Sequence, residues 1–232
     1  MSDRNCLSFW FPRIRDAGIP VPKTTIVRTD LQLSYLLDGE TPEGFEGFLD
    51  EIGKACDEIG YPLFLRTGHT SGKHRWSDTC FLKNKESIPS HIANLVEFSA
   101  LADFIGLDDS VWCIREFLET NPIGFCPDYG GMPVNREFRF FVDDGKILCR
   151  HSYWPLKALN QGGLSGDFPF GWYEEFCKLP EGSELDDIAK KAGIACGGRW
   201  SVDILETAKG WYLTDMAEAD RSFHWDGCPN AK

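Results

Sequence analysis

The sequence predicts a mixed fold of helices and strands, of the α/β or the α+β class. Apolar residues recur at helical spacing over 46–59, 90–105 and 184–196, and short strand-like runs lie between and after these segments. The expected order is strand, helix, strand, helix, strand, then a β-hairpin, a helix and a second β-hairpin. This order lacks the strict alternation of strand and helix that a doubly wound parallel sheet requires.

Local signals support each of the first elements. A glycine and two prolines in "GIPVPKTTIV" interrupt an N-terminal helix or turn and lead into a β-branched strand. Gly60 and Gly106 follow the first two helical segments, where glycine is a common stop. "YPLFLRTG" (61–68) and "VWCIREFLE" (111–119) have the composition of short, buried strands.

Composition describes an ordinary globular chain, with 232 residues, 42% hydrophobic and 26% charged. The formal charge of −12 argues against a general grip on nucleic acid or on anionic lipid, although a local basic pocket is compatible with it. The N-terminal sequence has no apolar run of signal-peptide type, and no later run approaches the length of a membrane span. We therefore expect a cytoplasmic protein with no nucleic-acid or membrane partner.

The nine cysteines are odd in number and scattered, with no CxxC and no Cys/His cluster of zinc spacing. Several lie in apolar runs, where a free cysteine packs as a small hydrophobic residue. The expectation is a set of reduced, structural thiols.

The first predicted hairpin lies in "NREFRFFVDDGKILCRHSYWP". Asp144-Gly145 is a favoured two-residue turn, and regular pairing from it places Arg139 opposite Arg150. Two guanidinium groups facing each other are unfavourable unless an anion lies between them. The alternative is that both arginines are solvated on an exposed sheet face, with one of them paired to Glu137.

The second predicted hairpin lies in "SVDILETAKGWYLTDMAEAD". A three-residue loop over 208–210 places Asp203 opposite Asp215, and two such carboxylates need a shared proton or a divalent cation. With Glu218 just beyond, this all-oxygen set suits Mg²⁺ or Mn²⁺ better than zinc. A four-residue loop over 207–210 is the alternative, and it would put the two aspartates on opposite faces.

A third basic segment, "FLRTGHTSGKHRWSDTCFL" (64–82), is predicted to form a strand, a Gly/Ser/Thr loop and a second strand. Arg66 and Lys73 lie in it, so the loop is a candidate flap over phosphate groups, or else a simple polar turn. It is neither a Walker loop nor a GxGxxG fingerprint. Basic and acidic groups together suggest a polyphosphate with its metal ion.

Five segments in this order resemble the ATP-grasp superfamily: "GIPVPKT", "YPLFLRTGHTSGKHRWSDT", "VWCIREFLE", "REFRFFVDDGKILCR" and "WSVDILETAKGWYLTDMAEAD". They resemble most a compact arginine/two-lysine clade found in phages and bacteria, which is related to the cell-division-cycle chaperone that assembles a translation factor. The resemblance implies two α+β lobes that clasp a nucleotide. It implies an N-terminal region over 1–60, a first lobe with the flap over 61–118, and a second lobe with the metal-binding hairpin over 119–232.

The resemblance also assigns roles to residues. The nucleotide phosphates would be held by Arg66, Lys73 and Arg139, and the adenine would face the backbone of Glu116, Phe117 and Leu118, with Glu119 at the ribose. Mg²⁺ or Mn²⁺ would be bound by Asp203, Asp215 and Glu218. An acidic substrate would be held by Arg150 and Arg221, which act with Arg139 in catalysis. Two departures stand out: many members have lysine at the position of Arg66, and asparagine near Ala217 and Glu218.

The activity implied is ATP-dependent ligation, in which a carboxylate becomes an acyl phosphate and an amine displaces the phosphate. The alternatives are an ATP-binding chaperone or assembly factor without turnover, and a kinase or nucleotidyl transferase of the same fold. The expected partners are ATP, Mg²⁺, and an acidic small molecule or peptide, with a protein partner in the chaperone case.

Overall fold

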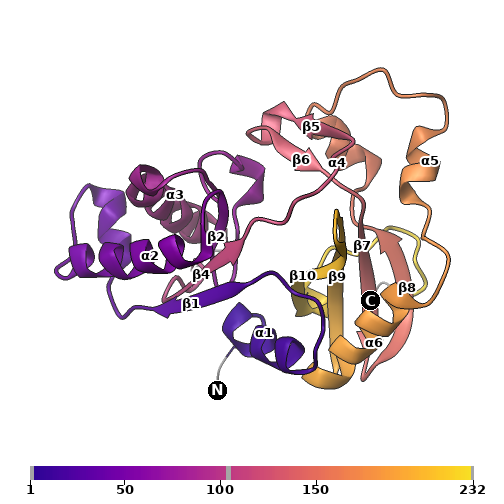
Figure 1. The fold of residues 1–232 in the computed structure, drawn as a ribbon, viewed down its shortest axis with the longest axis horizontal. Helices are drawn as coiled ribbons and strands as arrows, with labels where there is room; N and C mark the ends of the chain where they lie inside the picture. Colours follow the sequence, from indigo (N-terminus) through magenta and orange to yellow (C-terminus); the bar gives the residue numbers. More distant parts are fainter. Residues whose placement is uncertain (1–2, 103–105, 231–232) are drawn as a thin grey trace. The chain divides into compact units, whose positions relative to one another are not determined.

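The computed structural model describes residues 3–102 and 106–230, which form two compact units (Figure 1). Unit 1 comprises Met1–Val21, Glu119–Cys126 and Pro133–Lys232, and unit 2 comprises Pro22–Leu118 and Pro127–Met132. The segment 1–60, predicted as one N-terminal region, is therefore divided between the two units.

Unit 2 contains a four-stranded antiparallel sheet in the order β1-β4-β2-β3. Its strands are β1 (Thr24–Arg28), β4 (Val111–Glu116), β2 (Leu63–Thr67) and β3 (Phe81–Leu82). Its helices are α2 (Phe45–Ile59) and α3 (Ile88–Leu101), with short 3₁₀ turns η1 (Leu33–Asp38), η2 (Lys73–Arg75), η3 (Lys85–Ser87) and η4 (Pro127–Tyr129). The helix predicted over 90–105 thus begins earlier and ends at Leu101, and 103–105 lie outside the described residues.

Helices α2 and α3 pack on one face of this sheet because each has an apolar stripe. Ile52 and Ile92 contribute to a core that includes Leu65 and Ile114 from the strands, all fully buried. Side chains alternate along a strand, so the neighbours of these core residues point to the opposite, helix-free face. Arg66 is one of these neighbours. The alternation therefore places its positive charge on the face opposite the apolar core.

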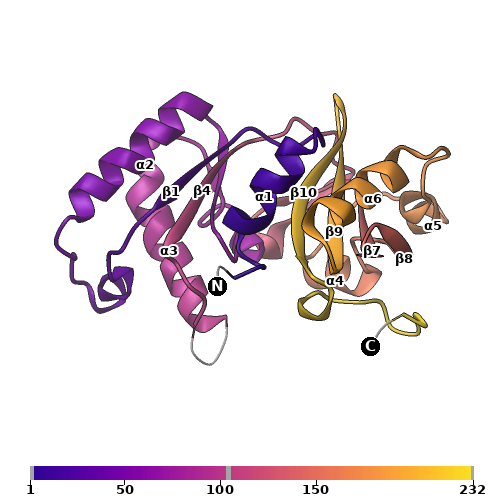
Figure 2. The same cartoon turned by 90° about the horizontal axis from the view of Figure 1, so that it is seen from below.

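Unit 1 contains a second four-stranded antiparallel sheet, in the order β10-β9-β7-β8. Its strands are β7 (Glu137–Asp143), β8 (Lys146–Ser152), β9 (Arg199–Thr207) and β10 (Gly210–Glu218). Its helices are α1 (Leu7–Asp16), α4 (Leu156–Gln161), α5 (Trp172–Cys177) and α6 (Glu184–Cys196), and η5 (Ala219–Arg221) follows β10. Helices α1 and α6 contact each other and cover one face of the sheet (Figure 2).

A short pair of strands, β5 (Gly124–Cys126) and β6 (Met132–Val134), forms a separate two-stranded sheet. The segment between them belongs to unit 2, where the Tyr129 ring stacks on His74 with centroids 4.5 Å apart. Among the described residues, no helix has both the length and the apolar composition needed to cross a bilayer.

The hairpin of β7 and β8 begins as predicted and then departs from the predicted register. Val142 lies opposite Ile147, but a bulge at Leu148 shifts the pairs that follow, so that Arg150 lies opposite Phe140. Arg139 lies opposite His151. The predicted pairing of Arg139 with Arg150 is therefore wrong, because one extra residue on a strand turns every later side chain to the other face.

The hairpin of β9 and β10 reaches the predicted pairing by a different route. Its turn has two residues, since Gly210 pairs with Thr207, and the predicted three-residue loop is wrong. A bulge at Thr214 then compensates for the shorter turn and brings Asp215 opposite Asp203. The predicted opposition of the two aspartates is confirmed.

Candidate active site

One face of the unit 1 sheet carries a concentration of charge. Arg139 on β7 lies directly opposite Asp203 on the neighbouring strand β9, and Asp203 lies opposite Asp215 on β10. Residues that face each other across strands point to the same side. This side is the one that α1 and α6 leave uncovered, and we call it the carboxylate face.

Arg139 and Asp203 form a two-pronged ion pair at the centre of this face. Arg139 Nε and Nη2 donate to the two Asp203 oxygens at 2.7 and 2.8 Å, and the two side chains are only 14% and 6% exposed. Burial alone would lower the pKa of Arg139, but the adjacent Asp203 carboxylate outweighs burial and raises it. The guanidinium carbon also lies 4.7 Å from the centre of the Tyr153 ring. The arginine is therefore charged and held in one orientation.

Glu137 adds a third carboxylate to the same face, because it precedes Arg139 by two positions on β7. Its side chain is buried and accepts a hydrogen bond from Thr214 Oγ1 at 3.3 Å. From the sequence, Glu137 was expected at most to neutralise an arginine. The two-residue spacing in "EFR" is the signal that places it beside the aspartates.

Glu218, the third predicted metal ligand, is not brought to this face. It follows Asp215 by three positions on a strand and so points to the opposite side. There its carboxylate accepts a hydrogen bond from Arg4 Nε at 2.7 Å and another from Asn5 Nδ2 at 3.3 Å. The N-terminal segment thus binds Glu218, which the sequence predicted as a ligand of the metal ion.

The two arginines predicted to hold substrate lie in different surroundings. Arg150 points toward α6, where its Nε donates to Asp186 at 2.8 Å. This hydrogen bond raises the pKa of Arg150 and lowers that of Asp186. The bulge at Leu148 is what turns Arg150 away from the carboxylate face. Arg221 lies in η5 with an exposed side chain.

In unit 2, the two predicted phosphate-binding cations approach the same buried thiol. Arg66 is 4% exposed on the helix-free face, and its Nε donates to Thr67 O at 3.1 Å. Burial raises the pKa of the Cys80 thiol to about 12, and the nearby charges of Lys73 and Arg66 oppose that rise. Both cations therefore lie near the strand and loop that the sequence identified as a flap.

The loop between β2 and β3 is fastened at several points. Thr79 Oγ1 donates to Gly72 O at 2.9 Å, and Gly72 has a left-handed φ of 59° with the Thr79 side chain directly beside it. A side chain at Gly72 would be strained and crowded. The His91 ring on α3 lies 2.7 Å from Thr79 O through Nδ1, so α3 holds the end of the loop. In this structure the predicted flap has a defined conformation.

His91 makes the stability of this loop depend on pH. Burial lowers the pKa of His91 below its ordinary value of 6.5, against the opposing effects of Thr79 O and Asp78. The folded state therefore prefers the neutral ring, and its stability should fall as the pH drops below 6.5, by at most about 1.4 kcal/mol per pH unit. His91→Asn keeps a donor near the Nδ1 position and should flatten this dependence. Hydrogen exchange of the backbone amides of residues 79–82, measured from pH 7 to pH 5, gives the stability of the loop at each pH. If the slope of this stability against pH is the same in His91→Asn as in the wild type, His91 is not the group responsible.

The segment predicted to face adenine follows the end of β4. The backbone N–H of Glu116 donates to Lys23 O at 2.8 Å, and its carboxylate accepts from Lys23 N at 3.2 Å, so Glu116 is occupied within the sheet. Phe117 follows it and packs against Phe81 with ring centroids 4.9 Å apart. The predicted ribose contact, Glu119, is exposed and belongs to unit 1, where its carbonyl accepts from Ala208 N at 3.0 Å.

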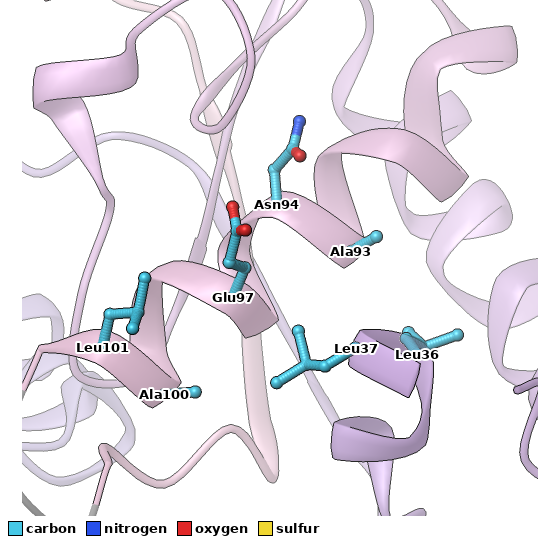
Figure 3. Close-up of a pocket in the computed structure, with 7 residues that line it drawn as sticks. All are labelled: Leu36, Leu37, Ala93, Asn94, Glu97, Ala100 and Leu101. Carbon is cyan, nitrogen blue, oxygen red and sulfur yellow. The ribbon is translucent and has the colours of Figure 1, made fainter. Parts of the chain in front are cut away.

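A depression of about 370 Å³ on unit 2 is a poor candidate for the nucleotide. It lies between η1 and α3 and is lined mainly by leucine and alanine (Figure 3). Its two polar side chains are engaged elsewhere: Asn94 donates to Asp78 O at 2.8 Å, and Glu97 pairs with Arg75. Among the residues that the structure describes, no cation lines this depression to receive a phosphate group.

Comparison with known proteins rests on structure, because neither a protein-family model nor a curated protein sequence matches the chain. Cdc123 from Schizosaccharomyces pombe matches with a TM-score of 0.59 and 16% identity, covering 99% of this chain and 93% of Cdc123. The ATP-grasp ligase PsnB, complexed with a minimal precursor, matches at 0.51 and 14%, covering 98% and 56%. The RimK domain ATP-grasp protein from Sphaerobacter thermophilus matches at 0.50 and 13%, covering 92% and 59%.

These likenesses confirm the fold that the five sequence motifs predicted: the chain has an ATP-grasp fold. It spans 56% of the PsnB chain and 59% of the RimK domain protein chain. The structural likeness to Cdc123 extends over nearly the whole length of both chains.

Proposed function

We propose that the chain is an ATP- and Mg²⁺-dependent ligase, which activates a substrate carboxylate as an acyl phosphate for attack by an amine. The observation that carries this proposal is the group of Arg139, Asp203 and Asp215 on the carboxylate face of an ATP-grasp fold. Transfer of a phosphoryl group needs a cation that stabilises the developing charge, and carboxylates that hold a divalent metal ion.

In unit 2, Arg66 and Lys73 would bind the phosphates, and the backbone of Glu116, Phe117 and Leu118 would face the adenine. Glu119 would reach the ribose. In unit 1, Arg139 would hold the transferred phosphoryl group, and its fixed orientation by Asp203 supports that role.

The oxygen donors of the carboxylate face fit Mg²⁺. Each Asp203 oxygen accepts one N–H from Arg139, which leaves lone pairs for a cation, and Asp215 faces it across the strands. When bound, Mg²⁺ would neutralise phosphate charge. Glu137 takes the place of Glu218 in this proposal because Glu218 pairs with Arg4 on the other face. Likewise Arg221, rather than the Asp186-bound Arg150, is proposed for an acidic substrate.

A nucleotide-binding assembly factor is the second candidate. The match to Cdc123 covers 93% of that protein, whereas the match to PsnB covers 56%, so the parts that complete the ligase are not matched by this chain. In this case ATP and Mg²⁺ would order a protein-binding surface without turnover.

Binding of ATP with Mg²⁺ is expected to raise the melting temperature of the protein. At a ligand concentration of one hundred times Kd, the gain is about 2.7 kcal/mol. Lys73→Ala should weaken nucleotide binding at least about tenfold, the loss expected for one phosphate contact of about 1.4 kcal/mol. Lys54→Ala, an exposed lysine on α2, is the matched control and should bind as the wild type does. Differential scanning fluorimetry and calorimetry measure both effects.

The products then distinguish the candidates. Incubation with ATP, Mg²⁺ and pooled carboxylates and amines should release ADP and phosphate if the chain is a ligase. Binding without turnover would support the assembly factor, a phosphorylated product a kinase, and AMP a nucleotidyl transferase. Absence of any stabilisation by ATP and Mg²⁺ would overturn the proposal.

A further inference from the structure

Four side chains with metal-ligating atoms converge in unit 1, next to the ion pair of Arg139 and Asp203. Two come from β8, Cys149 and His151, and two from the segment after η5, His224 and Cys228. One ligand atom from each lies within 4.8 Å of the other three, and Cys149 Sγ lies 3.2 Å from His224 Nε2. All four side chains are half-buried.

The bulge at Leu148 is what assembles the β8 half of this cluster. Without it, regular pairing from the Asp144-Gly145 turn would put Cys149 opposite Phe140, on the face covered by α6. With it, Cys149 lies opposite Phe141 and His151 opposite Arg139, so both point to the uncovered face. A Cys-x-His pair on a strand then presents two ligands side by side.

The C-terminal segment is fastened over these two residues by contacts on both sides of the cluster. Trp225 Nε1 donates to Ser152 O at 2.9 Å, and Asn230 Nδ2 donates to Leu148 O at 3.0 Å. The His224 ring stacks on Phe141 with centroids 3.8 Å apart. The His-x-x-x-Cys pair of the tail is thus held at the Cys-x-His pair of the strand.

We infer that these four residues bind a zinc ion. Two thiolates and two imidazoles are the ligand set of tetrahedral structural zinc, whose ligand atoms lie about 3.3 to 3.8 Å apart. A contraction of at most about 1.5 Å from the present spacing completes that geometry. In addition, His151 Nε2 is buried and has no hydrogen-bond partner among the described residues, which a metal or its shell would satisfy.

The chief alternative for the two cysteines is a disulfide. A disulfide would involve only Cys149 and Cys228. It would not explain why the imidazoles of His151 and His224 converge on the same point. Zinc uses all four groups. The inference is also independent of the nucleotide: these residues are neither the carboxylates nor the cations assigned to ATP and Mg²⁺.

A bound zinc ion would fix the C-terminal segment, residues 223–230, to β8. The tail also accepts a hydrogen bond at Phe223 O from Arg139 Nη1 at 3.1 Å, one residue before His224. Zinc would therefore fix the segment that contacts the central arginine of the carboxylate face, as structural zinc fixes loops elsewhere.

The test uses the full chain, purified without an affinity tag or chelator from zinc-supplemented cells. Elemental analysis should find about one zinc per chain. Cys149→Ser and Cys228→Ser should each reduce the zinc content to background, while Cys177→Ser, a half-buried cysteine on α5 outside the cluster, should retain it. Cobalt(II) added to the metal-free protein should give the visible bands of a tetrahedral site and a sulfur-to-metal charge-transfer band.

A second measurement on the wild-type chain guards against variants that fail to fold. Chelation should expose two thiols to a thiol reagent and increase proteolysis in 223–230 several-fold, and zinc should reverse both changes. Absence of zinc together with no cobalt spectrum would overturn the inference. A disulfide between Cys149 and Cys228 in the fresh protein would overturn it as well. So would zinc retained by a variant that carries both Cys149→Ser and Cys228→Ser.

Discussion

Replacing Asp203 by asparagine is expected to lower the free energy of unfolding by about 3 kcal/mol. The change removes one charge of a buried pair and leaves the Arg139 guanidinium, 14% exposed, without its partner. Nearly all of the cost comes from that uncompensated charge, because asparagine has the size of aspartate and still accepts a hydrogen bond. If the proposed function holds, the Mg²⁺-dependent part of nucleotide binding is lost as well.

A double variant separates the two contributions. Arg139→Met combined with Asp203→Asn removes both charges, so it should be more stable than Asp203→Asn alone. Glu206→Gln is the matched control on the same strand. Glu206 pairs with Arg136 at 3.1 Å, but the side chains are 41% and 30% exposed, and the loss should be about 1 kcal/mol or less. Chemical denaturation gives the free energy of unfolding of the wild type and of the three variants. If Asp203→Asn loses no more of this free energy than Glu206→Gln, the pair of Arg139 and Asp203 does not behave as a buried ion pair.

The sequence predicted the arrangement around Asp203 for a reason that was half right. The predicted three-residue loop placed Asp203 opposite Asp215, and the structure does pair them. The loop that was meant to bring them together is not the one formed. A bulge at Thr214 compensates for the shorter turn. The sequence around Thr214 does not predict this bulge, because a bulge depends on the packing of both faces of the sheet.

The same limit explains what was missed in the other hairpin. The Asp144-Gly145 turn is coded locally by two residues, and its first pairs are as predicted. The bulge at Leu148 then moved Arg150 toward α6 and Cys149 to the opposite face. The Cys/His cluster was missed for this reason and because its two halves lie far apart in the sequence. Short spacings such as Cys-x-His and His-x-x-x-Cys give a signal only when their strand and tail are known to meet.

The order of the five motifs was a stronger signal than any one of them. A fold is specified by many residues at once, so errors in two hairpin registers did not alter the predicted fold. Site geometry is different, since a shift of one residue on β8 turns Arg150 away from the carboxylates that Arg139 still faces. The fold was therefore confirmed although Arg150 lies away from Arg139; Glu218 lies away for another reason, its spacing of three positions from Asp215.

Replacing Gly193 by alanine is expected to destabilise unit 1 by about 2 kcal/mol, although alanine is the better helix former. Gly193 lies in α6, where the helix crosses the turn of the β7 and β8 hairpin. A Cβ there would lie 2.8 Å from Gly145 N and 2.9 Å from Val142 Cγ2. The first of these atoms is backbone, so the helix must move away from the turn, and the packing of α6 on the sheet loosens.

Gly47→Ala is the matched control, because Gly47 lies within α2 and nothing lies within 4 Å of an added Cβ. There the propensity should act alone and stabilise unit 2 by about 0.5 to 1 kcal/mol. The two identical substitutions should therefore have opposite signs. Hydrogen exchange resolved by peptide assigns each change to its unit, since the two units need not unfold together. If Gly193→Ala is as stable as Gly47→Ala, α6 does not rest on the hairpin turn, and the packing that turns Arg150 toward Asp186 is not as described.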